Sequence, residues 1–153
     1  MSAVVIGVGN AYRRDDGVGP AVVDALRHCH LPGVVLAECD GEPTRLLDLW
    51  SGADLAIVVD ATRSRSARPG TIHRRSLRHP SIKGAGAANS HAMDFGDAVA
   101  LAAALDRLPR VLLLFAVEAA DVSLGVGLSP EVAAAVPVVV DEIASLLRVT
   151  SCA

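Results

Sequence analysis

Short apolar runs alternate with longer helix-like stretches along the chain, and this alternation constrains the fold more than any other feature. The runs are too short for helices and end at glycine or polar residues, as buried strands do. Strands that alternate with helices predict a mostly parallel sheet covered on both faces. The predicted strands are Ala3–Val8, Gly33–Ala37, Leu55–Val59, Gly70–Arg74 and Val111–Val117, and the predicted helices are Gly17–Cys29, Pro43–Trp50, Phe95–Leu105 and Pro130–Leu147.

Two connections refine this α/β prediction. The loop before Gly70–Arg74 is too short for a helical crossover, so this strand is expected to run antiparallel to its neighbour. Ser129 is a good N-cap with Pro130 at the first helical position, which predicts a helix start there. Pro137 is expected to kink or interrupt the helix that follows.

Composition limits the classes of protein to which the chain can belong. Its 153 residues predict a single domain, 1–153, and 52% apolar residues suit a compact core. No apolar run reaches the roughly 18 residues of a membrane span, and we expect no signal peptide. Three cysteines without a CxxC motif favour a reduced, cytoplasmic protein. The net charge of −3 argues against general nucleic-acid binding.

The first predicted strand runs into the motif GVGNAYRRDDGVGP, which begins like a dinucleotide-binding turn. Tyr12 stands where the third glycine would be needed, and Asp15 and Asp16 would repel phosphates at the helix N-terminus. Dinucleotide binding is therefore disfavoured. Capping of the helix explains one of the two acids. It does not explain the other, or Asn10 in the tight turn before them.

Asp60 and His91 are the other candidate site residues. If the first strand is central, Asp16 and Asp60 flank one crevice outside the carboxyl ends of the strands. His91 precedes a predicted helix in a segment whose only other acid–base candidate is Asp94. Two carboxylates and one imidazole suit nickel, zinc, iron or manganese without choosing among them. The alternatives are a structural turn aspartate and a surface histidine.

Three further features have mainly structural interpretations. The sequence RHCH, Arg27–His30, looks metal-like, but consecutive helical residues point in different directions. Cys39 has no local partner that would make it a nucleophile. The segment Ala61–Met93 contains no acidic residue, and it is either a solvated edge or a docking surface for an acidic or polar partner. It holds half of the 14 basic residues: Arg63, Arg65, Arg68, Arg74, Arg75, Arg78 and Lys83.

The chain resembles the nickel–iron hydrogenase maturation endopeptidases almost end to end, through the segments GVGNAYRRDDGVGP, VVDAT, SHAMDFGDAVALA and LSPEVAAAVP. The resemblance implies a three-layer α/β/α sandwich with five strands in the order 2-1-3-5-4, the fourth being antiparallel. It also implies that Asp16, Asp60 and His91 bind a metal. Members of this family remove a C-terminal extension from the hydrogenase large subunit after nickel insertion.

We therefore expect a cytoplasmic endopeptidase that acts on a nickel-loaded hydrogenase large-subunit precursor. Asp16, Asp60 and His91 would contact nickel supplied by the precursor, while Gly9 and Asn10 would shape the turn that carries Asp16. The metal would polarise the scissile carbonyl, activate water, or only position the substrate while a carboxylate acts as general base. The alternatives are another metal-dependent hydrolase and a non-catalytic assembly factor. We expect neither nucleic acid nor a membrane as partner.

Overall fold

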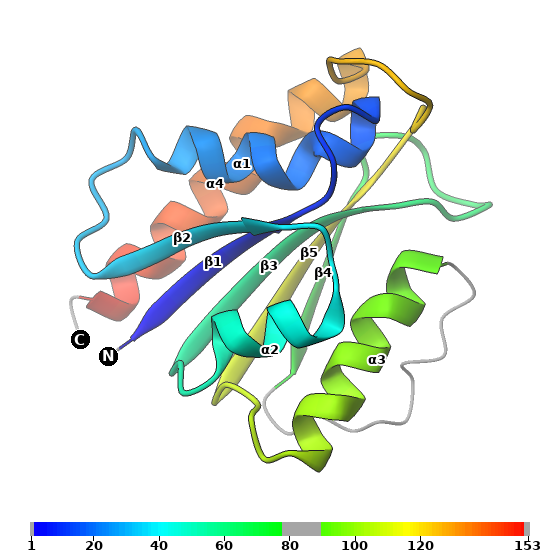
Figure 1. Ribbon diagram of the computed structural model, residues 1–153. Helices are drawn as coiled ribbons and strands as arrows, with labels where there is room; N and C mark the ends of the chain where they lie inside the picture. Colours follow the sequence, from blue (N-terminus) through cyan, green and yellow to red (C-terminus); the bar gives the residue numbers. More distant parts are fainter. Residues whose placement is uncertain (1, 78–89, 152–153) are drawn as a thin grey trace.

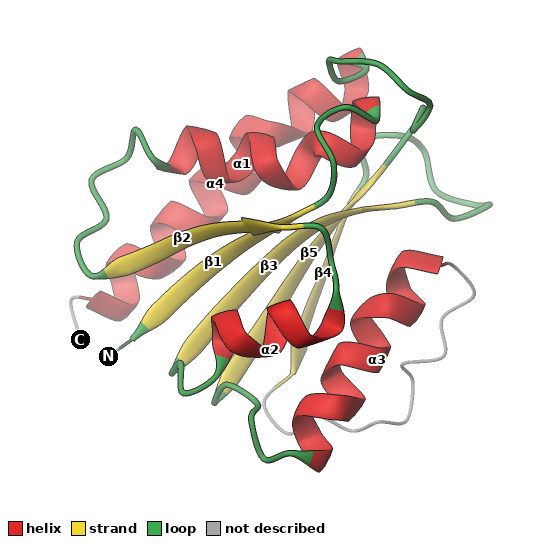
Figure 2. Ribbon diagram, in the orientation of Figure 1, coloured by secondary structure: helices red, strands yellow, loops and turns green. Residues whose placement is uncertain are grey.

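A five-stranded sheet lies between two pairs of helices in the computed structural model (Figures 1 and 2). The structure describes residues 2–77 and 90–151, and the side chains within 2–77 and 96–148. The strand order is β2-β1-β3-β5-β4, so the expected three-layer α/β/α sandwich is confirmed. The strands are β1 (Ala3–Val8), β2 (Val34–Cys39), β3 (Leu55–Thr62), β4 (Ile72–Leu77) and β5 (Val111–Glu118). The helices are α1 (Val18–Leu26), α2 (Pro43–Trp50), α3 (Ser90–Ala104) and α4 (Pro130–Ser151), and a 3₁₀ turn, η1 (Arg14–Gly17), precedes α1.

The strand directions agree with the connections between them. β1 pairs in parallel with β2 and β3, and β3 pairs in parallel with β5. β4 is antiparallel to β5, with His73 opposite Ala116, which confirms the prediction from the short β3–β4 loop. In the parallel β3–β5 pair, Asp60 is opposite Ala116 and Thr62 is opposite Glu118. The last residues of β3 and β5 therefore lie side by side where the parallel strands have their carboxyl ends. This border of the sheet, not an edge strand, is hereafter called the edge.

Helices cover both faces of the sheet, which explains why the central strands are apolar throughout. Helices α1 and α4 lie on one face, and α2 and α3 lie on the other (Figure 1). Alternate residues of each strand enter different cores: Val5 and Ile57 pack with α1 and α4, whereas Ile6 and Val58 pack with α2 and α3. Full burial of such a side chain contributes about 1.5–3 kcal/mol.

Several elements begin or end at other residues than predicted, among them α1, β3 and β4, and α4 differs from its prediction at Pro137. Helix α4 continues through Pro137, so the expected interruption is wrong. Its residues Val139 and Ile143 are fully buried, and this packing offsets the hydrogen bond that proline removes. Helix α1 is shorter than predicted, because Gly17 belongs to η1 and the helix ends at Leu26 instead of Cys29. β3 is longer and includes Asp60, since the chain stays paired with β5 up to Thr62.

Two remaining expectations concern membrane spans and cysteines. No helix within residues 2–77 and 90–151 has the length and hydropathy needed to cross a bilayer. Cys29 and Cys39 are free thiols, and Cys152 lies outside the described residues.

Candidate functional site

The connection between β1 and α1 (residues 9–17, including η1), hereafter the β1–α1 loop, closes tightly around Asp16. Gly9 has φ of 140°, and a Cβ there would lie 1.9 Å from the backbone oxygen of Asp16. Only glycine can occupy this position without displacing the backbone. The N–H of Asn10 donates to Oδ2 of Asp16 over 2.9 Å. Gly9 and Asn10 therefore shape the turn and orient the Asp16 carboxylate, as the sequence predicted.

The start of α1 brings Asp16 to the strand ends. A Cβ on Gly19 would lie 2.5 Å from the carbonyl oxygens of both Val8 and Val59, so the helix backbone contacts the ends of β1 and β3 directly. Asp60 follows Val59 and accepts a 2.8 Å hydrogen bond from the N–H of Ala61. Close packing of α1 thus requires a glycine of this motif, and Asp16 and Asp60 lie at the same edge of the sheet.

Both carboxylates are largely withdrawn from solvent, since Asp16 and Asp60 are each only 8% exposed. Carboxylate oxygens at such a place are suitable ligands for a divalent cation. Among the side chains in 2–77 and 96–148, no group of three or more His, Cys, Asp or Glu has the arrangement of a metal site. The two acids by themselves form an incomplete ligand set.

The side chain of His91 lies outside the described residues, so its predicted metal contact stays a prediction. Its backbone belongs to the first turn of α3 rather than to the loop before it. Figure 1 shows that α3 runs opposite to β5 and begins on the side of the sheet where β1 and β3 end. The side chain of Asp94 also lies outside the described residues.

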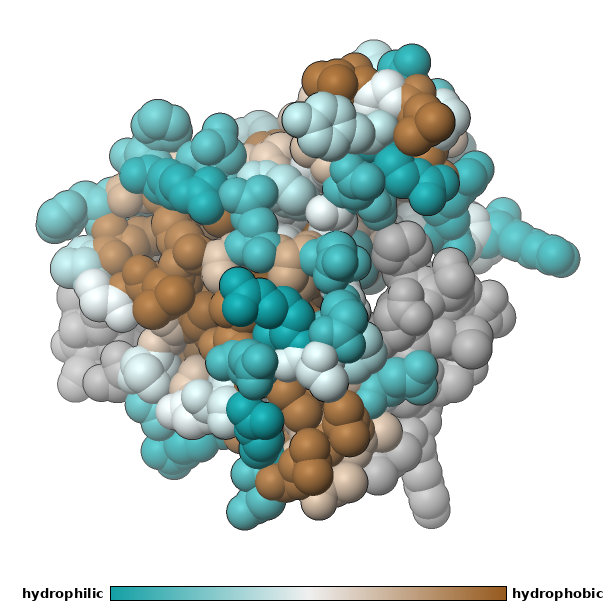
Figure 3. All heavy atoms as spheres, viewed as in Figure 1, coloured by the Kyte–Doolittle hydropathy of each residue, from teal (hydrophilic) through white to brown (hydrophobic). Residues whose placement is uncertain are grey.

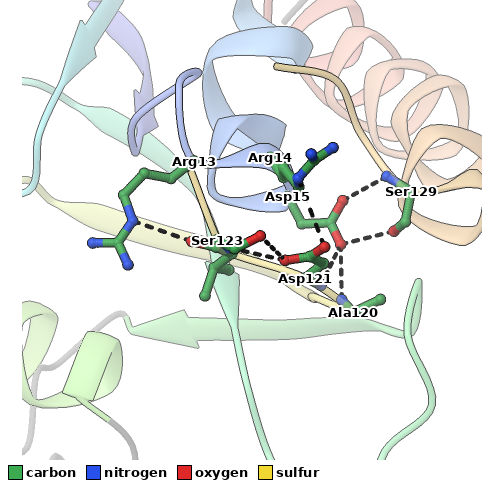
Figure 4. A network of polar contacts seen from close by, with 8 residues as sticks. Arg13, Arg14, Asp15, Ala120, Asp121, Ser123 and Ser129 are labelled. Atoms are coloured by element: carbon green, nitrogen blue, oxygen red, sulfur yellow. Dashed lines mark hydrogen bonds and ion pairs between the residues drawn. The ribbon is translucent and has the colours of Figure 1, made fainter. Parts of the chain in front are cut away.

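Asp15 has a different role from its neighbour. Its carboxylate is fully buried and accepts hydrogen bonds from the N–H groups of Ala120, Asp121 and Ser129 at 2.7–2.9 Å (Figure 4). The Ser129 hydroxyl donates a further bond of 2.7 Å. Burial would raise the pKa of Asp15, but these hydrogen bonds outweigh it and hold the pKa below its ordinary value. Through these hydrogen bonds, Asp15 connects the β1–α1 loop with the β5–α4 loop (residues 119–129).

The capping expectations are therefore corrected. Neither η1 nor α1 receives a side-chain cap from its own N-cap residue, and the Asp15 carboxylate bonds to the β5–α4 loop rather than to the first turn of α1. Ser129 does begin α4, because its carbonyl accepts from the N–H of Ala133 over 2.8 Å. Its hydroxyl, however, donates to Asp15 instead of capping the first turn.

Glu118 is a buried acid that the sequence analysis did not single out. It is 2% exposed, accepts from the N–H and hydroxyl of Ser64 at 3.0 and 2.6 Å, and lies 2.8 Å from His73 Nε2. Burial opposes ionisation, but the bonds from Ser64 and the contact with His73 lower the pKa of Glu118. The available signal was its place at the end of the run VLLLFAVE, which mirrors Asp60 at the end of LAIVVD.

The RHCH sequence and Cys39, which had structural interpretations, are explained by local contacts. In RHCH, Arg27 forms a 2.9 Å ion pair with Glu38, and the Cys29 thiol donates to the carbonyl oxygen of Ala25 over 3.9 Å. Burial raises the pKa of the Cys39 thiol, and the charges of Asp40 and Asp60 raise it further. A protonated thiol is a poor nucleophile, so Cys39 is not favoured as one.

Comparison with known proteins assigns the family. A model of the hydrogenase maturation protease family matches residues 20–146 of the chain. The chain belongs to the hydrogenase maturation protease family. It is 32% identical to the hydrogenase expression/formation protein HupD of Thiocapsa roseopersicina, over 84% of this chain. The match spans only 60% of the length of HupD, and 57% of the related protein HupM of Azotobacter chroococcum.

Solved structures of this family have the same fold. The [NiFe] hydrogenase maturation protease HybD of Thermococcus kodakarensis is 26% identical and superposes with a TM-score of 0.78, covering 96% of this chain and 99% of that one. The hydrogenase maturating endopeptidase HybD of E. coli has a TM-score of 0.80 at 23% identity, with 98% and 94% covered. The latter likeness supports the fold alone.

Proposed function

We propose that this chain is a cytoplasmic endopeptidase that removes the C-terminal extension of a nickel-loaded [NiFe]-hydrogenase large-subunit precursor. The family supports peptide hydrolysis in hydrogenase maturation, since its members are described as maturation proteases. The free thiols of Cys29 and Cys39 suit a reducing compartment. The observation that carries the nickel-sensing part is the pair of buried carboxylates, Asp16 and Asp60, at one edge of the sheet.

In this proposal, the nickel belongs to the substrate. Asp16 and Asp60, together with His91, contact the metal held by the precursor and thereby align the scissile peptide. The Asn10 N–H fixes one oxygen of Asp16, which leaves its orientation little freedom before the precursor arrives. A carboxylate near the scissile bond is also a suitable general base for the attacking water. Recognition through the metal would delay cleavage until nickel has been inserted.

The test compares nickel-loaded and nickel-free large-subunit precursor. We expect the loaded form to lose a C-terminal peptide, seen as a decrease in mass, and the nickel-free form to stay intact. Asp16→Asn and Asp60→Asn should remain folded and slow cleavage about 100-fold or more. Asp24→Asn, on the exposed side of α1, is the matched control and should cleave at the normal rate.

Each contrary outcome has a specific meaning. Equal cleavage of both precursor forms would contradict metal sensing but leave the peptidase assignment. Binding of the loaded form without any cleavage would make the chain a non-catalytic assembly factor. Normal cleavage by Asp60→Asn would reduce Asp60 to a structural residue at a strand end.

A further inference from the structure

The β1–α1 and β5–α4 loops are joined into one unit beside the carboxylates. The N–H of Arg14 donates to the Gly125 carbonyl over 3.0 Å, and the N–H of Gly125 donates to the Tyr12 carbonyl over 2.9 Å. Nε of Arg13 donates to the Val122 carbonyl over 3.1 Å (Figure 4). With the buried bonds of Asp15 beneath them, the two loops hold each other in a defined conformation.

The contact between Arg14 and Gly125 makes this conformation specific. Arg14 has φ of 47°, in the left-handed region that a residue with a side chain rarely adopts. Such a conformation costs about 1–3 kcal/mol and persists only where surrounding contacts hold it. A Cβ on Gly125 would lie 2.7 Å from Cζ of Arg14, so the guanidinium packs directly over the glycine backbone. Strain of this kind often accompanies a functional surface.

Three large apolar side chains project from this unit into solvent. Tyr12 is 72% exposed, Leu124 is 81% exposed and Val126 is 75% exposed. These are the highest values among the exposed large apolar side chains of the described residues. They lie close together, because Tyr12 is hydrogen-bonded to Gly125 and Leu124 and Val126 flank that glycine. Figure 3 shows apolar atoms gathered at the tip of the molecule over these loops.

The surroundings of this apolar group are mainly positive. Arg13 and Arg63 are exposed and Arg14 is partly exposed, and Asp121 is their acidic neighbour. Hydrogen bonds from Ser123 lower the pKa of Asp121, and the charges of Arg14 and Arg63 lower it further, which places both cations near this loop. The surface therefore combines exposed apolar groups with a positive border.

We propose that Tyr12, Leu124 and Val126, hereafter the apolar platform, bind an apolar segment of the hydrogenase precursor that is flanked by acidic residues. The identity of this partner rests on the proposed function. Exposed apolar patches with a polar border mark interaction sites. A surface that is already ordered loses little conformational entropy on binding, and buried aromatic and aliphatic anchors supply much of the affinity. The acidic flanks are attracted by the arginines.

The platform also has a defined position relative to the candidate site. Tyr12 lies only four positions before Asp16 in the chain, and both belong to the stretch that Asn10 and Asp15 hold in place. A precursor bound to the platform would therefore present neighbouring parts of its surface to the two carboxylates. The platform supplies affinity that a metal contact alone would not provide.

The experiment measures binding of immobilised nickel-loaded large-subunit precursor. The platform variant replaces its three members by serine, and we expect its dissociation constant to rise about tenfold or more, with a parallel rise in KM. The matched control removes three other exposed apolar side chains, by Val35→Ser, Leu105→Ser and Val138→Ser. It should bind within about twofold of the unmodified chain, and thermal unfolding verifies that both variants are folded.

A milder variant tests the role of the ring at position 12. Tyr12→Phe keeps the aromatic surface and should bind almost normally, whereas Tyr12→Ser alone should weaken binding severalfold. This comparison remains informative even if the triple variant does not fold.

The outcomes separate this proposal from the proposed function. Unchanged affinity in the platform variant, or an equal loss in the control variant, would overturn the platform. If the unmodified chain binds the precursor without cleaving it and the platform variant loses binding, the platform stands and the peptidase activity is wrong. If the unmodified chain does not bind the precursor at all, both proposals are wrong.

Discussion

Asp15 and Asp16 are adjacent in the chain, but their side chains have different partners. Asp15 accepts its hydrogen bonds from the β5–α4 loop, more than 100 positions away in the sequence. Asp16 accepts from Asn10 within its own loop and lies at the edge that also carries Asp60. One acid therefore joins two loops, and the other lies at the edge where the chemistry is proposed.

Replacement of Asp15 by alanine should destabilise the fold. The change leaves the buried donors on Ala120, Asp121 and Ser129 without their acceptor, so we expect a loss of about 2–4 kcal/mol in the free energy of unfolding. Urea unfolding at pH 7 measures it. Asp121→Ala removes an exposed carboxylate that bonds mainly to Ser123, and it serves as the control. Equal losses in the two variants would contradict the role of Asp15.

The contribution of Asp15 to the free energy of unfolding depends on pH. The folded-state pKa of Asp15 is lower than its unfolded value, which is about 3.9 for an ordinary aspartate. Its charge therefore stabilises the fold above that pH, and this contribution is lost as the pH falls through the folded-state pKa. The difference in stability between the unmodified chain and Asp15→Asn should narrow below about pH 4.

Among the elements, α1 determines where Asp15 and Asp16 lie relative to the carboxyl ends of β1 and β3. Its second residue, Gly19, packs against the carbonyls of Val8 and Val59, and Gly7 on β1 also packs against the backbone of Gly19. The helix can approach the sheet this closely because neither position has a side chain. The approach fixes where η1 lies, and η1 carries both aspartates.

Gly19→Ala should lower the free energy of unfolding, whereas a typical glycine-to-alanine change in a helix raises it. Such changes normally stabilise a helix by about 1 kcal/mol. Here the new Cβ would lie 2.5 Å from two carbonyl oxygens, so we expect a destabilisation of about 1–3 kcal/mol and slower precursor cleavage. Thermal unfolding and the cleavage assay measure both effects. Increased stability with normal cleavage would show that the helix can move away without consequence.

At the scale of the whole molecule, charge is distributed unevenly although the net charge is only −3. The β3–β4 loop carries the exposed residues Arg63, Arg65 and Arg68, and Glu118 holds this loop against β5 through Ser64. Arg74, by contrast, is paired with Glu142 on α4, so its charge is compensated within the chain. Arg78 and Lys83 lie outside the described residues. The loop arginines are therefore better candidates for docking than Arg74.

Neutralising the loop arginines should slow capture of the precursor. We expect Arg63, Arg65 and Arg68 changed together to glutamine to lower the association rate about three- to tenfold at low salt, and less at high salt. Stopped-flow or biosensor association measures it. A control with Arg27, Arg45 and Arg110 changed to glutamine has the same net charge. Equal association rates in the two variants would indicate that the loop is a solvated surface without a role in docking.

Much of the fold could be predicted from the sequence because the signals are local. Apolar runs of strand length, such as the one that ends at Asp60, encode a buried strand by their own periodicity. The antiparallel direction of β4 followed from the length of one loop. The boundaries of the elements depend on tertiary contacts as well. Pro137 predicted a kink or an interruption, but α4 is continuous through it, and burial of α4 against the sheet supports this continuity.

The candidate site was predicted only in part, because local sequence signals do not reveal contacts between distant parts of the chain. Sequence position indicated that Asp16 and Asp60 would flank one crevice, because the predicted strands before them are neighbouring and parallel. It did not indicate the partners of Asp15, or the link from Glu118 to Ser64 and His73, because these contacts join distant parts of the chain.

The sequence by itself determined the fold class, the order of most elements and the edge at which the acids gather. Tertiary structure decided which acid is structural, how closely α1 approaches the sheet, and which apolar side chains face solvent. Tyr12, Leu124 and Val126 belong to loops without periodicity, so no pattern predicted that they would lie together. Their position depends on hydrogen bonds between Tyr12, Arg14 and Gly125, which form only when packing of α1 and α4 against the sheet brings the two loops into contact.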